Sequence, residues 1–399
     1  MNYLRLGLWL SVLIGISSLA PLHATEAPAE VEWEPNIYPH DNLFPCFIIG
    51  TARGKLPEDL FASWPDSQIG DPQGIIGIML AGAKKGQKVE VSVKATDFFD
   101  ECVLKATLKE DANGILMHPK VPYNFRALSK VDQPTPVNLT FSLKIDGEDM
   151  GTKTTTVTLR SINDCLFGVV EELDDEDSQT SDYSWLFASY VNENHPWVDK
   201  ILKEALETGI VTSFDGYQSN NQDQVLLQVF AIWNVMQRRG LRYSDITTTS
   251  VEDEGVYSQH VRLFDESLNA SQANCVDGTV LLTAVLRKIG LDVSLVLVPG
   301  HMFLAFSLDD ETLLGLETTL MGADDLPALS KNNKFLRGDL EELKNERSFE
   351  TFLAALDVGT QALVENSEEF ENGELTHQII NLSVARNAGI LPIASGSKE

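Results

Sequence analysis

The 399-residue sequence predicts an α+β protein, with an N-terminal all-β sandwich followed by a second domain of mixed helices and strands. Three observations carry this prediction. Apolar and polar residues alternate over residues 86–165, as in strands with one buried face. Beyond residue 182 the apolar spacing changes to that of amphipathic helices. The chain also exceeds the roughly 100–200 residues of one ordinary domain, so two domains are expected.

The first 24 residues have the layout of a secretory signal peptide. Arg5 is their only formal charge, and an apolar run extends from Leu6 to about Ala20. We expect cleavage after Ala24 and export to the periplasm or the medium. The alternative of an uncleaved anchor is disfavoured because the run is shorter than the roughly 20 residues that span a bilayer. No later run is long and apolar enough to predict a membrane span.

Residues 30–168 are expected to form the β-sandwich. Alternation predicts strands at 89–93 and 137–145, and the second ends on Asp146-Gly147, a strong signal for a tight turn. Several short strands separated by turns are typical of a sandwich. Further short strands are expected at residues 47–49, 75–78 and 152–162.

An acidic run at residues 171–182 separates the two parts of the chain. Because a run of like charge cannot form a core, we expect a solvated and flexible interdomain linker. The run lacks the glycine-bearing loop of a calcium site, so no metal is predicted there. The second domain is expected to cover residues 183–393. Its helices are expected at 196–207, 224–238, 275–289, 338–345 and 348–366, and its strands at 293–298, 302–306 and 313–318.

Charge and cysteine content exclude several classes of function. The formal net charge is −29, and a surface this acidic repels nucleic-acid phosphates and anionic lipid. Cys46, Cys102, Cys165 and Cys275 match no zinc spacing and include no Cys-x-x-Cys pair, so neither a metal nor a cofactor is predicted. In an oxidising compartment two of the first three cysteines could pair, in any of three ways.

Cys275 is the first residue of a predicted helix in the stretch SQANCVDG, residues 271–278. A helix N-terminus carries partial positive charge and free N–H groups, which favour a thiolate over a thiol. Asp277 opposes this effect unless its side chain points away or caps the helix. Gly278 leaves one side of the first turn open, where a substrate backbone could approach closely. A buried, inert thiol is the competing interpretation of this cysteine.

A base and an orienting carboxylate follow Cys275 in chain order. His301 comes after Pro299-Gly300 at the start of an apolar strand, where it could accept the thiol proton and later protonate a leaving group. Glu317 interrupts the apolar strand in LLGLETT, and sheet pairing would place it beside the imidazole. The competing interpretations are a strand-end histidine bonded to a carbonyl and an exposed carboxylate.

Acyl transfer also needs hydrogen-bond donors for an oxyanion. The backbone N–H of Cys275 is the first candidate. The side chains of Gln272 and Asn274, just upstream, are the next candidates, and Gln259 is a more distant one. Trp233 could shield such a site, although its helical spacing favours the core.

Together these residues resemble the transglutaminase-like superfamily of papain-like fold. The resemblance rests on Cys275-x-Asp277 before a helix that ends in LRKIGLD, a strand-borne histidine with Phe303 two residues later, and a carboxylate on the next strand. It covers roughly residues 195–390 and is strongest over 271–319. The string ANCVDGTVLLTAVLRKIGLDVSLVLVPGHMFLAF, with LETT after it, is similar to a poorly characterised bacterial exported branch.

The resemblance implies a papain-like second domain and a triad that works through an acyl-thioester. Carried over by position, Cys275 would be the nucleophile, His301 the general base and acid, and Glu317 the orienting carboxylate, where many relatives have Asp. The implied enzyme is a cysteine peptidase, an amidase or a crosslinking acyltransferase. Its substrate would be a peptide or protein, with cell-envelope material as one candidate.

Two other functions stay open. A catalytically inactive transglutaminase-like scaffold or binding protein of the cell envelope would keep the domain for its shape and hold a partner on the sandwich. A redox role for Cys275 lacks a resolving cysteine nearby in the sequence. A Cys275 sulfur out of reach of His301, or sealed from solvent, would favour the scaffold.

Overall fold

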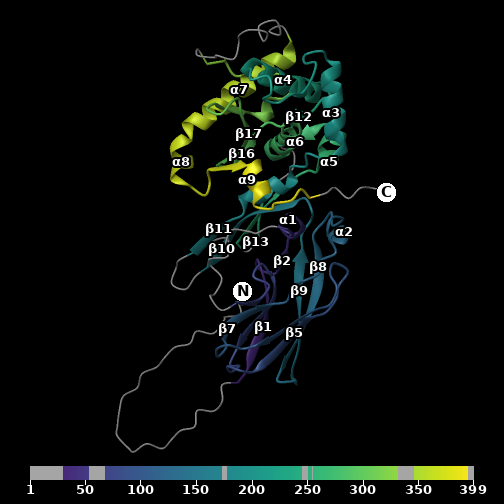
Figure 1. The fold of residues 1–399 in the computed structure, drawn as a ribbon, viewed down its shortest axis with the longest axis vertical. Helices are drawn as coiled ribbons and strands as arrows, with labels where there is room; N and C mark the ends of the chain where they lie inside the picture. The colour runs from purple at the N-terminus through teal and green to yellow at the C-terminus, as the bar shows by residue number, and fades with distance from the viewer. Residues whose placement is uncertain are drawn as a thin grey trace, which may run out of the picture.

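The computed structural model describes residues 30–53, 68–172, 178–244, 250–253, 255–330 and 346–393. The signal peptide expected at 1–24 and the helix expected at 338–345 lie outside these ranges. Within them the fold is of the α+β class, and Figure 1 shows an elongated molecule with sheets towards one end and most helices towards the other. None of the helices in this described part of the chain has the length and apolar character that crossing a bilayer requires.

Two sheets make up most of the N-terminal part, with strand orders β1-β4-β7-β3 and β2-β9-β8-β5-β6. Their strands are β1 Glu32–Ile37, β2 Asn42–Leu43, β3 Gln68–Gly70, β4 Ile76–Ala81, β5 Lys88–Val93, β6 Cys102–Thr107, β7 Asn113–His118, β8 Thr135–Ile145 and β9 Glu148–Leu159. The predicted alternation in β5 is confirmed, because Val89, Val91 and Val93 are buried and the residues between them are partly exposed. A short helix, α2 Phe125–Leu128, precedes β8.

The tight turn predicted at Asp146-Gly147 joins β8 to β9. Both residues have positive φ, 52° for Asp146 and 90° for Gly147. Two successive residues of this kind form the type I′ turn, whose twist matches that of the flanking strands. The turn thereby sets the register in which Leu139 and Phe141 of β8 lie in the core.

The strand predicted at residues 47–49 is wrong, because these residues belong to helix α1, Pro45–Gly50. Pro45 is the first helical residue, where its fixed φ is favourable and its missing N–H costs nothing. Phe47 and Ile48 are buried in the core. A short apolar run has no period by which a strand can be told from a helix, and here the proline decides.

The flexible linker predicted at 171–182 is also wrong for the residues that the structure describes. Strands β10, Asp164–Glu172, and β11, Ser178–Asp182, form an antiparallel pair, whereas residues 173–177 lie outside the described ranges. Glu171 is opposite Gln179, and Asp182 is opposite Gly168. Because no two carboxylates are directly opposed in these two pairs, the strands pair without the like-charge repulsion that the prediction assumed.

A third sheet connects the two parts of the chain, with strand order β11-β10-β14-β13. Strands β13, Ser250–Asp253, and β14, Val256–His260, come from the later part and pair antiparallel, with β14 also paired to β10. Val169 of β10 and Val256 of β14 are buried. The boundary expected between domains 30–168 and 183–393 therefore falls inside one hydrogen-bonded sheet.

The C-terminal part is built on a fourth sheet, with order β18-β17-β16-β19. Its strands are β16 Val293–Val298, β17 His301–Ser307, β18 Leu313–Leu316 and β19 Gln378–Asn381, and a separate parallel pair is β12 Arg242–Tyr243 with β15 Gln272–Ala273. The helical segments are η2 Ser184–Tyr190, α3 Pro196–Glu207, α4 Gln222–Arg238, α5 Phe264–Ala270, α6 Cys275–Lys288, η3 Thr318–Leu320, α7 Arg347–Glu365, α8 Ser367–Asn372 and α9 Leu382–Asn387.

The helices and strands predicted for this part are confirmed to within two residues at each end, wherever they fall in described ranges. Helix α6 packs on β16 and β17, and α7 packs on β18. The sheet thus holds α6 and the β16-β17 hairpin against each other, which brings Cys275 and His301 together.

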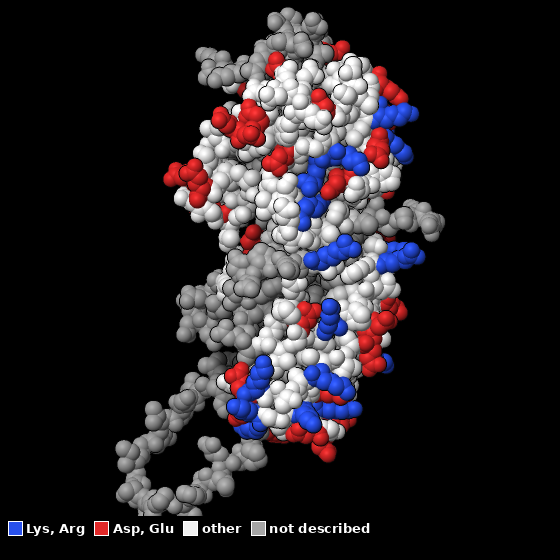
Figure 2. Space-filling model, viewed as in Figure 1, with Lys and Arg blue, Asp and Glu red and all other residues white. Residues whose placement is uncertain are grey.

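Acidic side chains gather over the α7 and α8 side of the face in Figure 2, whereas charges of both signs are interspersed over the N-terminal strands.

Candidate active site

Cys275 is the first residue of α6, and a reciprocal capping box fixes the start of this helix. Asn274 is the N-cap, and its Oδ1 accepts a hydrogen bond from the Asp277 N–H at 2.8 Å. Asp277 Oδ2 accepts one in return from the Asn274 N–H at 3.0 Å. Two otherwise unpaired backbone donors are satisfied in this way, which holds the first helical turn and the cysteine on it in place.

The structure also answers the objection that Asp277 would oppose a thiolate. Asp277 is fully buried and accepts hydrogen bonds at 2.8 Å from both the backbone N–H and the guanidinium of Arg262. Burial raises the pKa of Asp277, against the lowering effect of its bonds to Asn274 and Arg262. The side chain therefore caps the helix, as the sequence allowed, and Arg262 balances its charge.

Gly278 does not leave the open side that the sequence suggested. It is buried, and a Cβ built on it would lie 3.1 Å from Oγ1 of Thr318 in η3. The glycine instead lets α6 pack closely on η3, the segment that follows Glu317. The open approach predicted for a substrate backbone at this position is wrong, because η3 occupies the space.

His301 begins β17 directly after the turn at Pro299-Gly300. Its Nε2 lies 2.6 Å from Oε2 of Glu317, and Cys275 is close enough to the ring to raise the His301 pKa. Since Nε2 is engaged by the carboxylate, Nδ1 is the ring nitrogen not used by Glu317. The buried ring of Phe303 stacks against the imidazole, with centroids 6.3 Å apart. The three predicted residues are thus brought together in the order Cys275, His301, Glu317.

Glu317 is held by three further hydrogen bonds. Its Oε1 accepts from the N–H of Thr319 at 3.0 Å and from the Thr319 hydroxyl at 2.6 Å. Its backbone N–H donates to the carbonyl of Ala355 in α7 at 3.0 Å. One carboxylate oxygen is thereby fixed to η3 while the other is presented to His301, so the side chain is buried and oriented rather than exposed.

The charges of the site favour a protonated imidazole. Hydrogen bonds to Cys275 and then to Glu317 raise the pKa of His301 to about 10, although burial acts in the opposite direction. Burial alone would raise the pKa of Glu317, but hydrogen bonds from His301 and Thr319 outweigh it and lower that pKa. At neutral pH the site therefore holds an imidazolium between a sulfur and an ionised carboxylate.

The reactive end of this line of residues is open to solvent. Cys275 is partly exposed, and the His301 side chain keeps 32% of its surface, whereas the Glu317 side chain keeps 8%. A substrate can therefore reach the sulfur and the imidazole, while the orienting carboxylate is shielded from water. Because Cys275 is partly exposed, its sulfur is not sealed from solvent, which was one of the two conditions that would favour an inert scaffold.

The oxyanion candidates differ in what they can contribute. Asn274 uses its side-chain oxygen to cap α6. Gln272 lies on the short strand β15, partly buried, and Gln259 on β14 donates its amide to the carbonyl of His260 at 3.1 Å. Because it lies at the start of the helix, the backbone N–H of Cys275 remains the first candidate donor for an oxyanion.

Trp233 belongs to the core, as its helical spacing predicted. It is fully buried, and its indole N–H donates to Thr351 Oγ1 at 3.0 Å. It therefore does not line the site.

Sequence reasoning missed two residues that support the triad. The sequence contains a local indication for Thr319, because a hydroxyl two residues after an acidic residue can hydrogen-bond to that residue's carboxylate. No local sequence pattern indicates the role of Arg262, because it follows β14 and contacts Asp277 only through tertiary packing. Thr319 holds Glu317, which orients His301, and Arg262 holds Asp277, which caps the helix that begins at Cys275.

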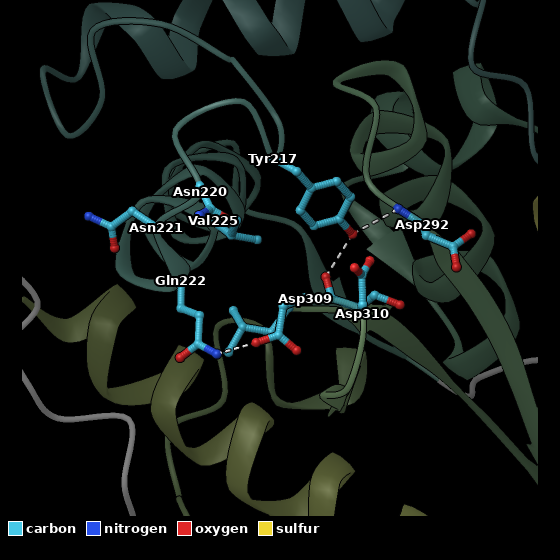
Figure 3. Close-up of a pocket in the computed structure, with 10 residues that line it drawn as sticks. Tyr217, Asn220, Asn221, Gln222, Val225, Asp292, Asp309 and Asp310 are labelled. Carbon is cyan, nitrogen blue, oxygen red and sulfur yellow. Dashed lines mark hydrogen bonds between the residues drawn. The ribbon is translucent and has the colours of Figure 1, made fainter.

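A separate acidic cavity lies at the other end of the sheet. It has a volume of about 670 Å³, and its lining includes Tyr217, Asp292, Asp309 and Asp310. The Tyr217 hydroxyl donates to the Ser307 carbonyl at 2.7 Å and accepts from the Asp292 N–H at 3.0 Å (Figure 3). Because Ser307 ends the strand that His301 begins, the cavity is separate from the triad. No group of three metal-binding side chains occurs among the described residues.

Comparison of the chain with models of known protein families found no match, and comparison with curated protein sequences found none either. The function is therefore judged from the geometry of the site itself.

Proposed function

We propose that the protein is an exported thiol enzyme that cleaves or transfers amide acyl groups through Cys275, His301 and Glu317. The observation that carries the proposal is the contact of 2.6 Å between His301 Nε2 and Glu317 Oε2, on a ring whose pKa Cys275 also raises. The nucleophilic end of the site is open to solvent and its carboxylate end is buried. This is the arrangement that activates a sulfur nucleophile and keeps a proton ready for the leaving group.

The reaction follows from the protonation states of the site. The Cys275 sulfur attacks the amide carbonyl carbon, and the carbonyl electrons move to the oxygen. When the C–N bond breaks, the His301 proton goes to the departing nitrogen, which leaves an acyl-thioester on Cys275. Water or an amine then gives a proton to His301 and attacks the thioester, and the sulfur leaves as the thiolate.

The elements around the triad lower the cost of these steps. The N-terminus of α6 offers partial positive charge to the sulfur and the Cys275 N–H to the oxyanion. Glu317 fixes the ring through Nε2, which leaves Nδ1 for the sulfur, and it stabilises the imidazolium on which the leaving-group proton is carried. Because Thr319 and Ala355 hold Glu317, the orientation of the ring does not depend on the substrate.

The substrate class follows from exposure and charge. A partly exposed sulfur at the end of a helix is accessible to peptides and proteins. The net charge of −29 disfavours nucleic acid and anionic lipid as partners. If the protein is exported, peptides and proteins of the cell envelope are the amides that it meets, and these are the substrates we propose.

The oxyanion donor is the observation that favours a second candidate function. Gln259 donates its amide to the His260 carbonyl, and the capping role of the Asn274 oxygen does not assign the Asn274 amide N–H to the oxyanion. A catalytically inactive scaffold or binding protein of the cell envelope, with the same domain shape, is the alternative that fits this observation.

Digestion of isolated envelope material separates the two functions. The wild-type protein and the Cys275→Ala variant are incubated with the same material, and the products are read by mass spectrometry for hydrolysed or newly crosslinked amides. The enzyme proposal expects new products with the wild-type protein alone. Identical product spectra, together with retention of both proteins on the envelope material, would support the scaffold.

A further inference from the structure

Two buried thiols lie together where α1 meets β10, in a part of the molecule that the triad does not use. Cys46 and Cys165 are each fully buried. The Cys46 Sγ lies 3.2 Å from the backbone carbonyl oxygen of Asp164, the residue before Cys165. Cys165 and Leu166, the residue after it, also act on the ionisation of the Cys46 thiol. The sulfur of Cys46 therefore lies against the β10 backbone beside Cys165.

We propose that Cys46 and Cys165 form a disulfide that links α1 to β10. The sequence left three pairings open among Cys46, Cys102 and Cys165, and the fold selects this one. Cys102 lies on β6, an edge strand of a sheet that does not contain β10. Cys275 is the first residue of α6, away from α1 and β10, and acts on the pKa of His301.

The cross-link forms by exchange with a disulfide oxidant, either a protein disulfide or oxidised glutathione. One of the two cysteines attacks the oxidant as the thiolate and displaces one of its sulfurs as a thiol. The sulfur of the other cysteine then attacks the first cysteine's sulfur and releases the second sulfur of the oxidant as a thiol. The two cysteines lose two protons and two electrons in total, and the oxidant gains them as it becomes two thiols.

Full burial of both sulfurs determines when the bond can form. An oxidant cannot reach two side chains with no exposed surface, so the bond forms as the chain folds and not afterwards. The link closes a loop of well over 100 residues, and closing a long loop restricts the unfolded chain. It also attaches the N-terminal part to β10, the strand that pairs with β14 and so leads to Arg262 beside the catalytic helix.

The test is refolding of the full chain under controlled redox conditions. The reduced, unfolded protein is refolded in a mixture of reduced and oxidised glutathione and then denatured without reductant. The remaining thiols are alkylated in the denatured state, and non-reduced peptides are mapped by mass spectrometry. We expect one peptide pair joined through Cys46 and Cys165, with two hydrogen atoms fewer than the separate peptides. Cys102 and Cys275 should carry the alkyl group.

Variants and reductant provide the controls. Cys46→Ser and Cys165→Ser should each lose the cross-linked pair, whereas Cys102→Ser should keep it. The urea midpoint of the oxidised wild-type protein should fall when reductant is added, and that of Cys46→Ser should not move. Alkylation of both Cys46 and Cys165 after refolding, or a cross-link through Cys102, would overturn the proposal. This test does not depend on the triad being active.

Discussion

Glu317 reaches His301 because its side chain is long enough to serve two partners at once. Its Oε2 contacts His301 and its Oε1 is bound by the N–H and the hydroxyl of Thr319. Its backbone begins η3, one residue beyond β18, where it is tied to α7. A carboxylate with one methylene less would have to give up one of these contacts, which explains why glutamate fits this position.

Replacing Glu317 with glutamine should change the titration of His301. An ordinary histidine has a pKa of about 6.5, and Cys275 and Glu317 together raise that of His301 to about 10. Glu317→Gln removes the negative charge, so we expect the His301 pKa to fall by about one unit or more. The ring can be followed by NMR of protein labelled at histidine nitrogen.

The control for this change is Thr319→Val, which keeps the carboxylate but removes one of its donors. It should lower the His301 pKa less than Glu317→Gln does. Because the folded pKa lies above the unfolded one, the charged histidine stabilises the fold in full below pH about 6.5, and this contribution is lost as pH rises through about 10. An unchanged titration in Glu317→Gln would show that the carboxylate does not act on the ring.

At the scale of single elements, the cap of α6 should be one of the most sensitive parts of the fold. Asp277 closes the capping box and pairs with Arg262 while fully buried. Asp277→Ala leaves the guanidinium without its partner, so we expect the free energy of unfolding to fall by about 3–5 kcal/mol. Urea unfolding measures this change.

Asp199 provides the matched control, because it also lies in the first turn of a helix. Its side chain is 72% exposed and forms an ion pair with Lys288 at 3.7 Å. Asp199→Ala should therefore change the free energy of unfolding by no more than about 1 kcal/mol. Equal losses for the two variants would contradict a special role for the α6 cap.

The contact between β18 and α7 is close enough to require glycine on both sides. A Cβ on Gly315 would lie 2.1 Å from the Gly359 carbonyl oxygen, and one on Gly359 would lie 2.5 Å from the Leu316 nitrogen. This approach lets the Ala355 carbonyl accept the Glu317 N–H. Helix α7 is therefore a positioning element for the third member of the triad.

Gly359→Ala should separate α7 from β18 and displace Glu317. We expect it to lower the free energy of unfolding by about 1–3 kcal/mol or more, and to lower the His301 pKa as well. Val364→Ala, on an exposed position of the same helix with 68% of its surface open, should do neither. A stable Gly359→Ala protein with an unchanged His301 titration would show that this contact does not position the carboxylate.

Local sequence patterns predict single helices and strands, but they do not predict which distant strands pair. The order of α6, β16, β17 and β18 follows from apolar periods that each segment contains, so Cys275, His301 and Glu317 could be nominated from sequence. The apolar residues 47–49 could equally be helix or strand, and only the position of Pro45 distinguishes them. The role of Thr319 depended on a contact that the pattern permits but does not require.

Over the whole molecule, the decisive pairing joins residues far apart in the chain. Strands β10 and β14 are separated by more than 80 residues, and nothing within either segment specifies its partner. Because the acidic run was interpreted as a linker, the division into domains 30–168 and 183–393 cuts through this sheet. Arg262 was missed for the same reason, since it reaches Asp277 only once β14 is in the sheet.

Two fragments test whether the shared sheet is needed. A fragment of residues 183–393 lacks β10 and β11, which leaves Val256 without the strand that covers it. A fragment that begins at residue 161 keeps both strands. We expect the shorter fragment to unfold at a lower urea concentration than the longer one, as followed by circular dichroism. A shorter fragment as stable as the full chain would show that the second domain is independent.

The rate at which Cys275 reacts with iodoacetamide at neutral pH tests the triad most directly. Cys46, Cys102 and Cys165 are buried, so the native protein should label rapidly at Cys275 alone, and Cys275→Ala should not label rapidly at all. His301→Ala removes the cation beside the sulfur, so labelling should slow by about tenfold or more. Equal labelling rates in the wild-type protein and His301→Ala would contradict the proposal that His301 activates Cys275.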